Sequence, residues 1–181
     1  AHLAERDITL LRGEARFEDA HCLRVRRADG AEEILAFDRA LIATGASPAV
    51  PPVDGLAGTP YWTSTEALAA SDAPEHLLVL GGSYVALELA QAFLRLGSRV
   101  TLVARSRLLS RLEPDIGQTL GAALVTEGMR IIEGQAPRSV RYDDAGFKIE
   151  LGGEQISGDR LLVATGRRPN TAALSLPSTG I

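Results

Sequence analysis

A short apolar run, a pair of glycines and an amphipathic helix follow one another without a break in the middle of this 181-residue chain. The run is Leu77 to Leu80, the glycines are Gly81 and Gly82, and Gly97 ends the helix. Apolar residues recur at helical spacing at Val85, Leu89, Phe93 and Leu96. This strand–turn–helix unit restricts the fold more than any other segment, because it predicts the start of a parallel sheet.

The same alternation continues beyond Gly97. Residues 100–103 predict a second strand, and a helix after Pro114 should bury one stripe before a third strand at Ile131 and Ile132. The residues expected on that stripe are Ile116, Leu120 and Leu124. The order β-α-β-α-β predicts an α/β fold with a Rossmann-like parallel sheet and right-handed crossovers.

Shorter alternating runs on both sides of this region predict antiparallel strands. In residues 8–37 they form a β-meander, with Asp29-Gly30 as a type I′ turn leading back into Ile34 to Phe37. Residues 40–43 are continuously apolar and predict a buried strand. A second hairpin is expected to turn at Gly152-Gly153.

An eleven-residue segment occurs twice. Residues 38–48 and 159–169 are identical at seven of eleven positions, and each contains Ala-Thr-Gly. If each copy closes a nucleotide-binding unit, the first unit lacks its beginning, so we expect a fragment of a larger protein. The proline- and glycine-rich residues 48–60 are expected to be a linker between domains.

Composition excludes several classes of protein. With 45% hydrophobic and 23% charged residues the chain should be globular, and neither a membrane span nor a signal peptide is evident, which predicts a cytoplasmic location. A net charge of −4 argues against nucleic-acid and membrane partners. Cys22 is the single cysteine, and the three histidines, expected to be solvated, share no metal-ligand spacing, so no metal site is predicted. They are His2, His21 and His76.

The turn after the first strand has the character of a dinucleotide-binding fingerprint. Such a site needs a glycine for the tight turn and small residues where backbone approaches pyrophosphate, which the helix N-terminus then holds. Ser83 and Ala86 replace two of the three usual glycines. The candidate cofactor-binding residues are Gly81, Gly82, Ser83, Tyr84 and Val85. The alternative is a tight β-α turn that binds nothing.

The end of the second predicted strand distinguishes two nucleotides. An NAD site usually places an acidic residue there, but this chain has Ala104, followed by Arg105, Arg107 and Arg111. Guanidinium groups bind a 2′-phosphate well, so NADPH is favoured over NADH. Against this, 18 of the 19 basic residues are arginine, and a surface loop would often contain several by usage alone.

Four stretches resemble the pyridine nucleotide-disulfide oxidoreductases, and within that family the mercuric reductases. They are LIATGASPAVPP from Leu41, YWTSTEAL from Tyr61, VALELAQAF from Val85 and LLVATGRRPN from Leu161. The resemblance implies an enzyme that passes hydride from NADPH to FAD, then electrons through a cysteine pair to Hg(II), releasing Hg(0). It also implies a homodimer when the protein is intact.

The resemblance implies residue roles as well. Tyr84 would stack near the flavin and move for the nicotinamide, with Glu88 close by, and Arg105 and Arg111 would hold the 2′-phosphate. Gly166 and Arg167 would lie near the nicotinamide half, and Thr44 and Gly45 would border FAD. Residues 1–47 would then be part of the FAD-binding domain, 48–167 the NAD(P)H-binding domain, and 168–181 the return to the FAD domain.

The 181 residues lack the family's FAD-binding glycine loop and its redox cysteine pair. We therefore expect no catalytic residue in this fragment, no mercury reduction by it alone, and at most weak FAD binding. Two alternatives stay open. One is another enzyme of the family, such as dihydrolipoamide dehydrogenase or an NADH oxidase, and the other is a nucleotide-binding or scaffold module without catalysis.

Overall fold

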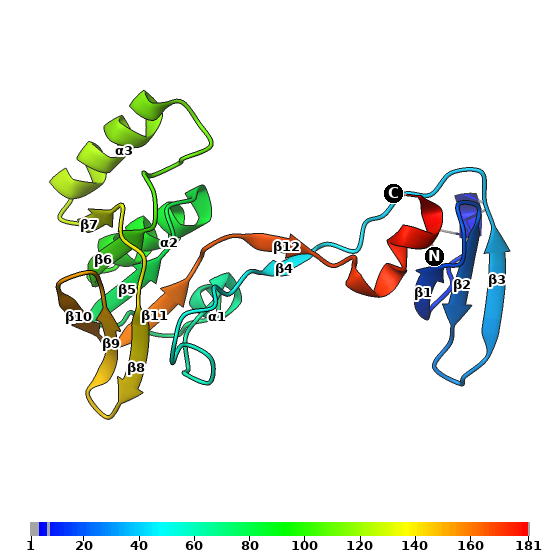
Figure 1. Cartoon of the computed structure of the whole chain (residues 1–181), viewed down its shortest axis with the longest axis horizontal. Helices are drawn as coiled ribbons and strands as arrows, with labels where there is room; N and C mark the ends of the chain where they lie inside the picture. The colour runs from blue at the N-terminus through cyan, green and yellow to red at the C-terminus, as the bar shows by residue number, and fades with distance from the viewer. Residues whose placement is uncertain (1–3, 7, 181) are drawn as a thin grey trace. The chain divides into compact units, whose positions relative to one another are not determined.

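The computed structural model describes residues 4–6 and 8–180. The chain divides into two compact units, unit 1 (Ala1–Ser47 and Arg168–Ile181) and unit 2 (Pro48–Arg167). It passes between them twice, through β4 (Ala46–Pro48) and β12 (Arg167–Pro169), which pair as a two-stranded sheet (Figure 1).

Four parallel strands form the centre of unit 2 in the order β11-β5-β6-β7. Their bounds are β5 His76–Leu80, β6 Arg99–Ala104, β7 Arg130–Glu133 and β11 Arg160–Val163. The helices are α1 (Ser64–Leu68), α2 (Tyr84–Arg95) and α3 (Pro114–Thr126). The predicted Rossmann-like parallel sheet is therefore confirmed.

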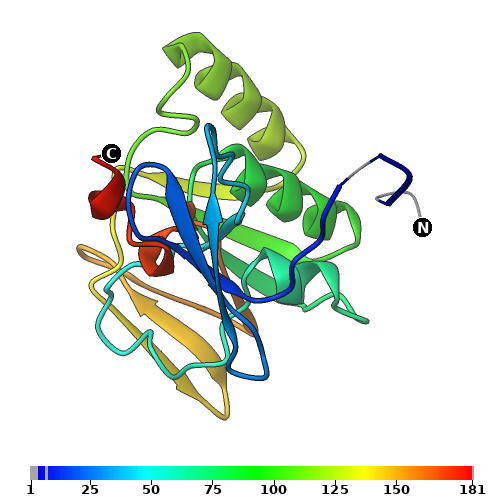
Figure 2. The ribbon, with the colours of Figure 1, turned by 90° about the vertical axis from the view of Figure 1, so that its right-hand side faces the viewer.

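An antiparallel meander covers one face of this sheet, and α2 and α3 lie on the other side (Figure 2). The meander is β8 (Ser139–Asp143), β9 (Gly146–Glu150) and β10 (Gln155–Gly158), and β9 and β10 form the hairpin expected at Gly152-Gly153. Along β5, Leu77 and Val79 pack on the helical side, whereas Leu78 and Leu80 pack against the meander. Burial of both faces explains why this strand is continuously apolar.

The buried stripes of both long helices differ from the predicted ones. In α2 the buried residues are Ala86, Leu87, Ala90 and Phe93, and Leu96 is exposed. In α3 Leu124 is buried as predicted, but Ile116 is exposed, and Gly117 is buried where a Cβ atom would lie 2.5 Å from the Leu108 carbonyl oxygen. Small residues form much of both stripes because the backbones of these helices approach their neighbours closely.

Residues 48–60 are irregular as expected, but the linker prediction is wrong, because they belong to unit 2 and pack on it. Leu56 is fully buried in the core between the parallel sheet and the meander. Asp54 bridges to Ser139 at the start of β8, and the Val140 N–H donates to the Asp54 carbonyl at 2.8 Å. Proline and glycine thus exclude regular secondary structure in this segment, but the segment is still packed against the core of unit 2.

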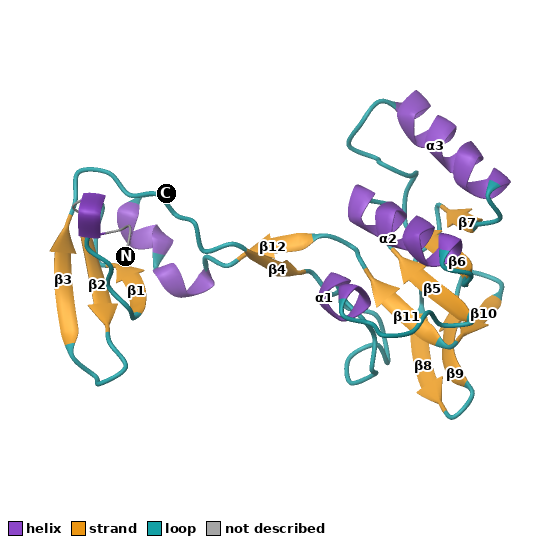
Figure 3. Ribbon diagram, turned by 180° about the vertical axis from the view of Figure 1, so that it is seen from behind, coloured by secondary structure: helices purple, strands orange, loops and turns teal. Residues whose placement is uncertain are grey.

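Unit 1 consists of a small antiparallel sheet with short 3-10 helices (Figure 3). The strands are β1 (Glu14–Phe17), β2 (Cys22–Arg26) and β3 (Glu32–Ala36), and the 3-10 helices are η1 (Ala4–Arg6), η2 (Ala172–Leu174) and η3 (Leu176–Thr179). Ser178 donates its hydroxyl to the Phe17 carbonyl at 3.1 Å, which ties the C-terminal segment to β1. The predicted meander is confirmed for residues 14–36, whereas residues 8–11 form no strand and are mostly exposed.

The β2–β3 turn is not of type I′, which needs a positive φ at both central residues. Only Gly30 has one, at 84°. The Gly30 N–H donates to the Arg27 carbonyl at 3.0 Å, and the Arg27 N–H donates to the Ala31 carbonyl at 2.8 Å. These bonds define a wider loop that ends in a left-handed glycine, and the register of the hairpin follows from it.

The strand predicted at residues 40–43 is absent, and Leu41 is 92% exposed. The equivalent residues of the repeat, Leu161 to Val163, are buried in β11, where β5 pairs with them. Among the described residues no strand pairs with 40–43 in this way. The repeat therefore shows that an apolar run becomes a strand only where a neighbour supplies hydrogen bonds and a covering layer.

His76 is half-buried rather than solvated, which corrects the sequence-based expectation; His21 is exposed, and His2 lies outside the described residues. The His76 Nε2 atom lies 2.9 Å from the Thr101 hydroxyl, and its backbone N–H donates to the Asp159 carboxylate at 2.6 Å. Burial, and secondarily the charge of Arg99, lower the pKa of His76 from its usual value of 6.5. The neutral imidazole is the form that suits the fold.

We expect unit 2 to lose stability as the pH falls from about 7 to about 5. The folded chain binds the His76 proton less readily than the unfolded chain, so protonation below about pH 6.5 favours unfolding. His76→Gln, which keeps a polar partner for Thr101, should flatten this dependence. Urea unfolding followed by the fluorescence of Trp62, the one tryptophan, would measure it. An equally steep dependence in the variant would contradict the assignment to His76.

Candidate functional site

The predicted glycine turn joins the end of β5 to α2, and its first glycine is required by geometry. Gly81 has a φ of 138°, and a Cβ atom there would lie 2.3 Å from the Ala164 carbonyl oxygen. Its N–H donates to the Val103 carbonyl of β6 at 2.9 Å. Gly81 therefore brings β5, β6 and the end of β11 to one point, as a tight dinucleotide-binding turn does.

The N-terminus of α2 opens beyond this turn without a side-chain cap. Ser83 is the N-cap residue, but its hydroxyl makes no capping bond and lies 3.4 Å from the Ala164 carbonyl oxygen. The first-turn N–H groups of a helix have no partner within the helix, and they carry the positive end of its dipole. An anion such as pyrophosphate fits this position, since backbone amides can donate to it.

Tyr84 and Glu88 lie on the exposed side of α2, four residues apart and so on one face. Tyr84 is 67% exposed although it is a large aromatic residue at the start of the helix. Val85, which precedes the buried Ala86, is partly buried against the hydrophobic core between α2 and the parallel sheet. The structure thus brings Gly81, Gly82, Ser83, Tyr84 and Val85 together in one turn, with Glu88 one helical turn further on.

Ala104 ends β6 at the place where an acidic residue would contact an NAD ribose. It is 1% exposed, and a Cβ on Gly82 would lie 3.0 Å from the Ala104 Cβ. The glycine turn therefore packs directly against a small apolar residue. Residues 105–112, here called the arginine loop, begin immediately after it.

The three arginines of this loop differ in what they bind. The Arg107 guanidinium donates to the carbonyls of Ser110 at 3.1 Å and Leu112 at 2.7 Å, so it folds the loop back on itself. Arg105 and Arg111 are exposed, and within residues 4–6 and 8–180 their guanidinium groups have no hydrogen-bond or ion-pair partner. The sequence did not distinguish these roles, because the loop's shape decides them.

Two residues that hold the loop were not recognised from the sequence. Leu108 is 2% exposed, and its N–H donates to the carboxylate of Glu133 at the end of β7. The next N–H, of Leu109, donates to the Gly82 carbonyl at 2.8 Å. The sequence shows an acidic residue, Glu133, at the carboxyl end of the third strand. Its partner, the Leu108 N–H, could not be predicted without the register of β6 and β7.

Gly166 follows β11 close to the glycine turn. The Ala164 N–H donates to the Leu80 carbonyl at 2.8 Å, and Gly166, with a φ of 133°, accepts from the Ala49 N–H at 2.9 Å. Thr165 donates its hydroxyl to the Ala49 carbonyl at 2.6 Å. Arg167 follows at the start of β12, with its side chain exposed.

Thr44 and Gly45 lie in unit 1, where Asn170 holds them. The Asn170 amide donates to the Thr44 carbonyl at 3.1 Å, and its backbone N–H donates to the Gly45 carbonyl at 3.0 Å. Ser47 completes the contact by donating to the Asn170 side-chain oxygen at 2.8 Å. These two candidate residues therefore belong to a different unit from the glycine turn.

Cys22 lies partly buried in β2. Burial, and then the charge of Asp19, raise the pKa of its thiol, so it stays protonated at neutral pH. In the described part of the chain no group of three or more metal-ligating side chains is found. Over the same residues, no helix is long and apolar enough to cross a bilayer.

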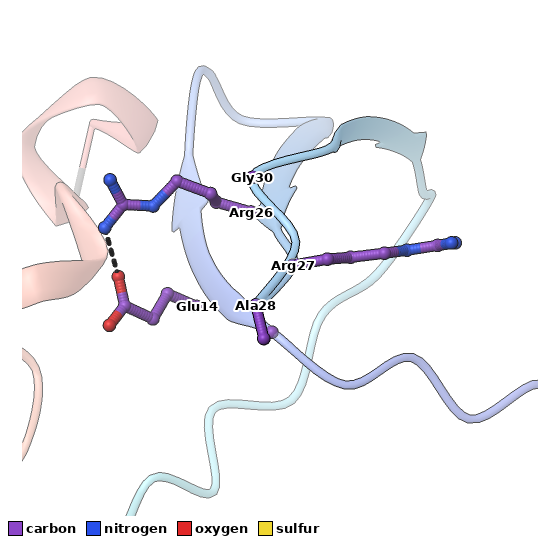
Figure 4. A pocket seen from close by; sticks show the side chains of 6 residues that line it. Glu14, Arg26, Arg27, Ala28 and Gly30 are labelled. Atoms are coloured by element: carbon purple, nitrogen blue, oxygen red, sulfur yellow. Dashed lines mark hydrogen bonds and ion pairs between the residues drawn. The ribbon is translucent and has the colours of Figure 1, made fainter.

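A surface hollow in unit 1 lies beside the β2–β3 loop, lined by Glu14, Arg26 and Arg27 among others (Figure 4). Arg26 donates to the Glu14 carboxylate at 2.6 Å, so the charges there neutralise each other. Another hollow, in unit 2, is lined by Trp62, residues 69–74 and Arg160. Neither lining includes the glycine turn or the arginine loop.

Residues 2–181 match the family described as pyridine nucleotide-disulphide oxidoreductase, so the chain belongs to that family. It is 52% identical to mercuric reductases of Acidithiobacillus ferrooxidans and Shigella flexneri, in each case over 96% of this chain and 32% of the relative. It is 43% identical to the mercuric reductase of Streptomyces lividans. The chain spans about a third of the length of these relatives.

Solved structures agree with this placement. The HOCl-induced flavoprotein disulfide reductase RclA from Escherichia coli, as a Cu(II) complex, superposes with a TM-score of 0.85 at 32% identity, covering 99% of this chain and 41% of that one. LpdA from Mycobacterium tuberculosis superposes with a TM-score of 0.78 at 28% identity, covering 96% and 39%. The resemblance, the α/β fold class and the cofactor classes drawn from the sequence are confirmed at the level of this family.

Proposed function

We propose that this chain is the NADPH-binding part of a flavin-dependent mercuric reductase. In the whole protein, NADPH would deliver hydride to FAD, and the electrons would then reduce Hg(II) to Hg(0). The observation that carries the nucleotide assignment is the pair of exposed arginines, Arg105 and Arg111, which make no hydrogen bond or ion pair within the described residues. They follow the small Ala104 in a chain whose helix α2 has no side-chain cap at its N-terminus. The 52% identity to mercuric reductases, which extends over 96% of this chain, supports Hg(II) as the electron acceptor of the whole protein.

Each candidate residue has a defined part in this proposal. The open amides around Ser83 and Tyr84 hold the pyrophosphate, for which Gly81 and Gly82 make room, and Val85 secures the helix to the core. Arg105 and Arg111 bind the 2′-phosphate through charge-assisted hydrogen bonds.

The exposed Tyr84 and Glu88 face the nicotinamide half, and we assign Gly166 and Arg167 to the same half. When bound, the nucleotide supplies the hydride. The chain's own residues orient it and, through Tyr84, govern access to the nicotinamide. In this scheme unit 2 is the NADPH domain, and residues 1–47 with 168–181 belong to the FAD domain, where Thr44 and Gly45 border the flavin.

The remaining assignments concern the whole protein. A single cysteine, with its pKa raised, cannot form a redox pair within these 181 residues, so we assign that step and mercury binding to other parts of the protein. A homodimer and a cytoplasmic location belong to the same proposal. A second candidate is a flavoprotein disulfide reductase with another acceptor, favoured by the similarity to RclA at 32% identity.

Two measurements test the proposal. Calorimetric titration of the 181-residue chain should give clearly tighter binding of NADPH than of NADH, and equal or absent binding of both would contradict the nucleotide assignment. In the intact protein, NADPH oxidation should depend on added Hg(II). Oxidation that proceeds with a disulfide or with Cu(II) but not with Hg(II) would favour the second candidate.

A further inference from the structure

We propose that Glu133 is a positioning residue that sets the preference for NADPH by fixing the arginine loop in its binding conformation. The inference rests on the proposed function. Glu133 is not offered as a contact of the nucleotide itself. It acts through the backbone of the loop that carries Arg105 and Arg111.

Glu133 occupies a position from which it reaches the loop. In the pairing of β6 with β7, the register places Glu133 opposite Ala104. It therefore ends its strand beside the residue that precedes the loop. Its carboxylate accepts the N–H of Leu108, four residues beyond Ala104.

Leu108 is the buried anchor of the loop, and it is enclosed by glycines from two elements. A Cβ on Gly82 would lie 3.6 Å from the Leu108 Cα, one on Gly117 would lie 2.5 Å from its carbonyl oxygen, and one on Gly121 would lie 3.2 Å from its side chain. A side chain at Gly117 would collide with the loop backbone and one at Gly121 would crowd the Leu108 side chain, so α3 packs closely on this residue. A buried N–H at such a site needs an acceptor, and Glu133 provides it.

The next residue shows that the loop is held in an unusual conformation. Leu109 has a φ of 46°, in the left-handed region that a leucine rarely adopts. Its N–H is held by the Gly82 carbonyl at 2.8 Å. Conformations of this kind persist where surrounding contacts enforce them, and here the enforcing contacts are the two consecutive N–H bonds to Glu133 and Gly82.

Because Glu133 is negatively charged, an electrostatic role and a positioning role predict opposite changes in NADPH affinity when it is removed. A carboxylate close to an anion-binding loop repels the anion, so a role through charge alone predicts that removing it tightens NADPH binding. A positioning role predicts the opposite, because without the Leu108 bond the loop no longer holds Arg105 and Arg111 in place. The two roles therefore give changes in opposite directions.

The experiment compares Glu133→Ala and Glu133→Gln with the unchanged 181-residue chain, by calorimetric titration with NADPH and separately with NADH. We expect Glu133→Ala to weaken NADPH binding about tenfold and to leave NADH binding unchanged. Glu133→Gln should keep most of the preference, because its amide oxygen can still accept the Leu108 N–H. The matched control is Glu127→Ala, which removes a surface carboxylate that binds Gln91 and Arg95 outside the loop.

A second measurement needs no nucleotide. Amide hydrogen exchange over residues 105–112 should become faster in Glu133→Ala and stay unchanged in Glu127→Ala. Unchanged exchange, or NADPH binding as tight as or tighter than in the unchanged chain, would overturn the positioning role. A chain that prefers neither nucleotide would instead overturn the proposed function, while the exchange experiment would still decide whether Glu133 holds the loop.

Discussion

Replacing Gly81 with valine is expected to lower the free energy of unfolding of unit 2 by ~3 kcal/mol or more. The reason is twofold. The φ of 138° is one that residues with a side chain rarely adopt, and the new Cβ would lie 2.3 Å from the Ala164 carbonyl oxygen. That oxygen is backbone at the end of β11, so the strand itself would have to move.

Urea unfolding followed by Trp62 fluorescence measures this effect in the correct unit, because Trp62 packs on Phe93 of α2 with ring centroids 5.9 Å apart. Gly152→Val is the matched control. Gly152 lies in the β9–β10 turn, where a Cβ meets no atom within 4 Å, and the cost there should be no more than about 0.5 kcal/mol. Equal stability of the two variants would contradict the close approach at Gly81.

The same variant separates a structural turn from a binding site. If the turn only joins a strand to a helix, the fraction of Gly81→Val that remains folded should bind NADPH as the unchanged chain does. If the turn holds pyrophosphate, we expect that folded fraction to lose most of its affinity, since the amides at the start of α2 would be displaced. Titration below the unfolding transition, corrected for the folded fraction, distinguishes the two.

Local pattern was sufficient to predict the parallel sheet and the glycine turn. β5 is apolar because both its faces are buried, and position 81 is a glycine because its φ requires one. Both features can therefore be predicted from the residues of the segment itself. Residues 40–43 show where this fails. They repeat the pattern of Leu161 to Val163, yet they form no strand, because pairing partners decide the outcome and local sequence does not encode them.

In the candidate site, too, some features could be predicted from local sequence and others depend on the fold. The absence of an acid at Ala104 and the presence of nearby arginines were visible in the sequence. The difference between Arg107, which binds loop carbonyls, and Arg105, which binds nothing in the part of the chain described, depends on the fold of eight residues. The bond from Leu108 to Glu133 joins residues 25 positions apart and follows from strand register. The roles of the loop arginines and of Glu133 therefore depend on the three-dimensional fold and could not be predicted from local residue spacing.

The second large effect concerns Arg105. We expect Arg105→Ala to weaken NADPH binding by about tenfold to a hundredfold and to leave NADH binding unchanged, since only NADPH carries the 2′-phosphate. The variant should cost almost no stability, because the side chain is exposed and makes no hydrogen bond or ion pair within the described residues. Adding Arg111→Ala should remove the remaining preference.

Two control variants make this result specific to position rather than to net charge. Arg141→Ala removes an exposed arginine from β8, outside the arginine loop, and should leave both affinities unchanged. Arg107→Ala removes the bonds to the Ser110 and Leu112 carbonyls, so it should weaken NADPH binding while also loosening the loop, visible as faster amide exchange over residues 105–112. If Arg141→Ala reduced the NADPH preference as much as Arg105→Ala, the preference would reflect overall charge, and the assignment of Arg105 to the 2′-phosphate would fail.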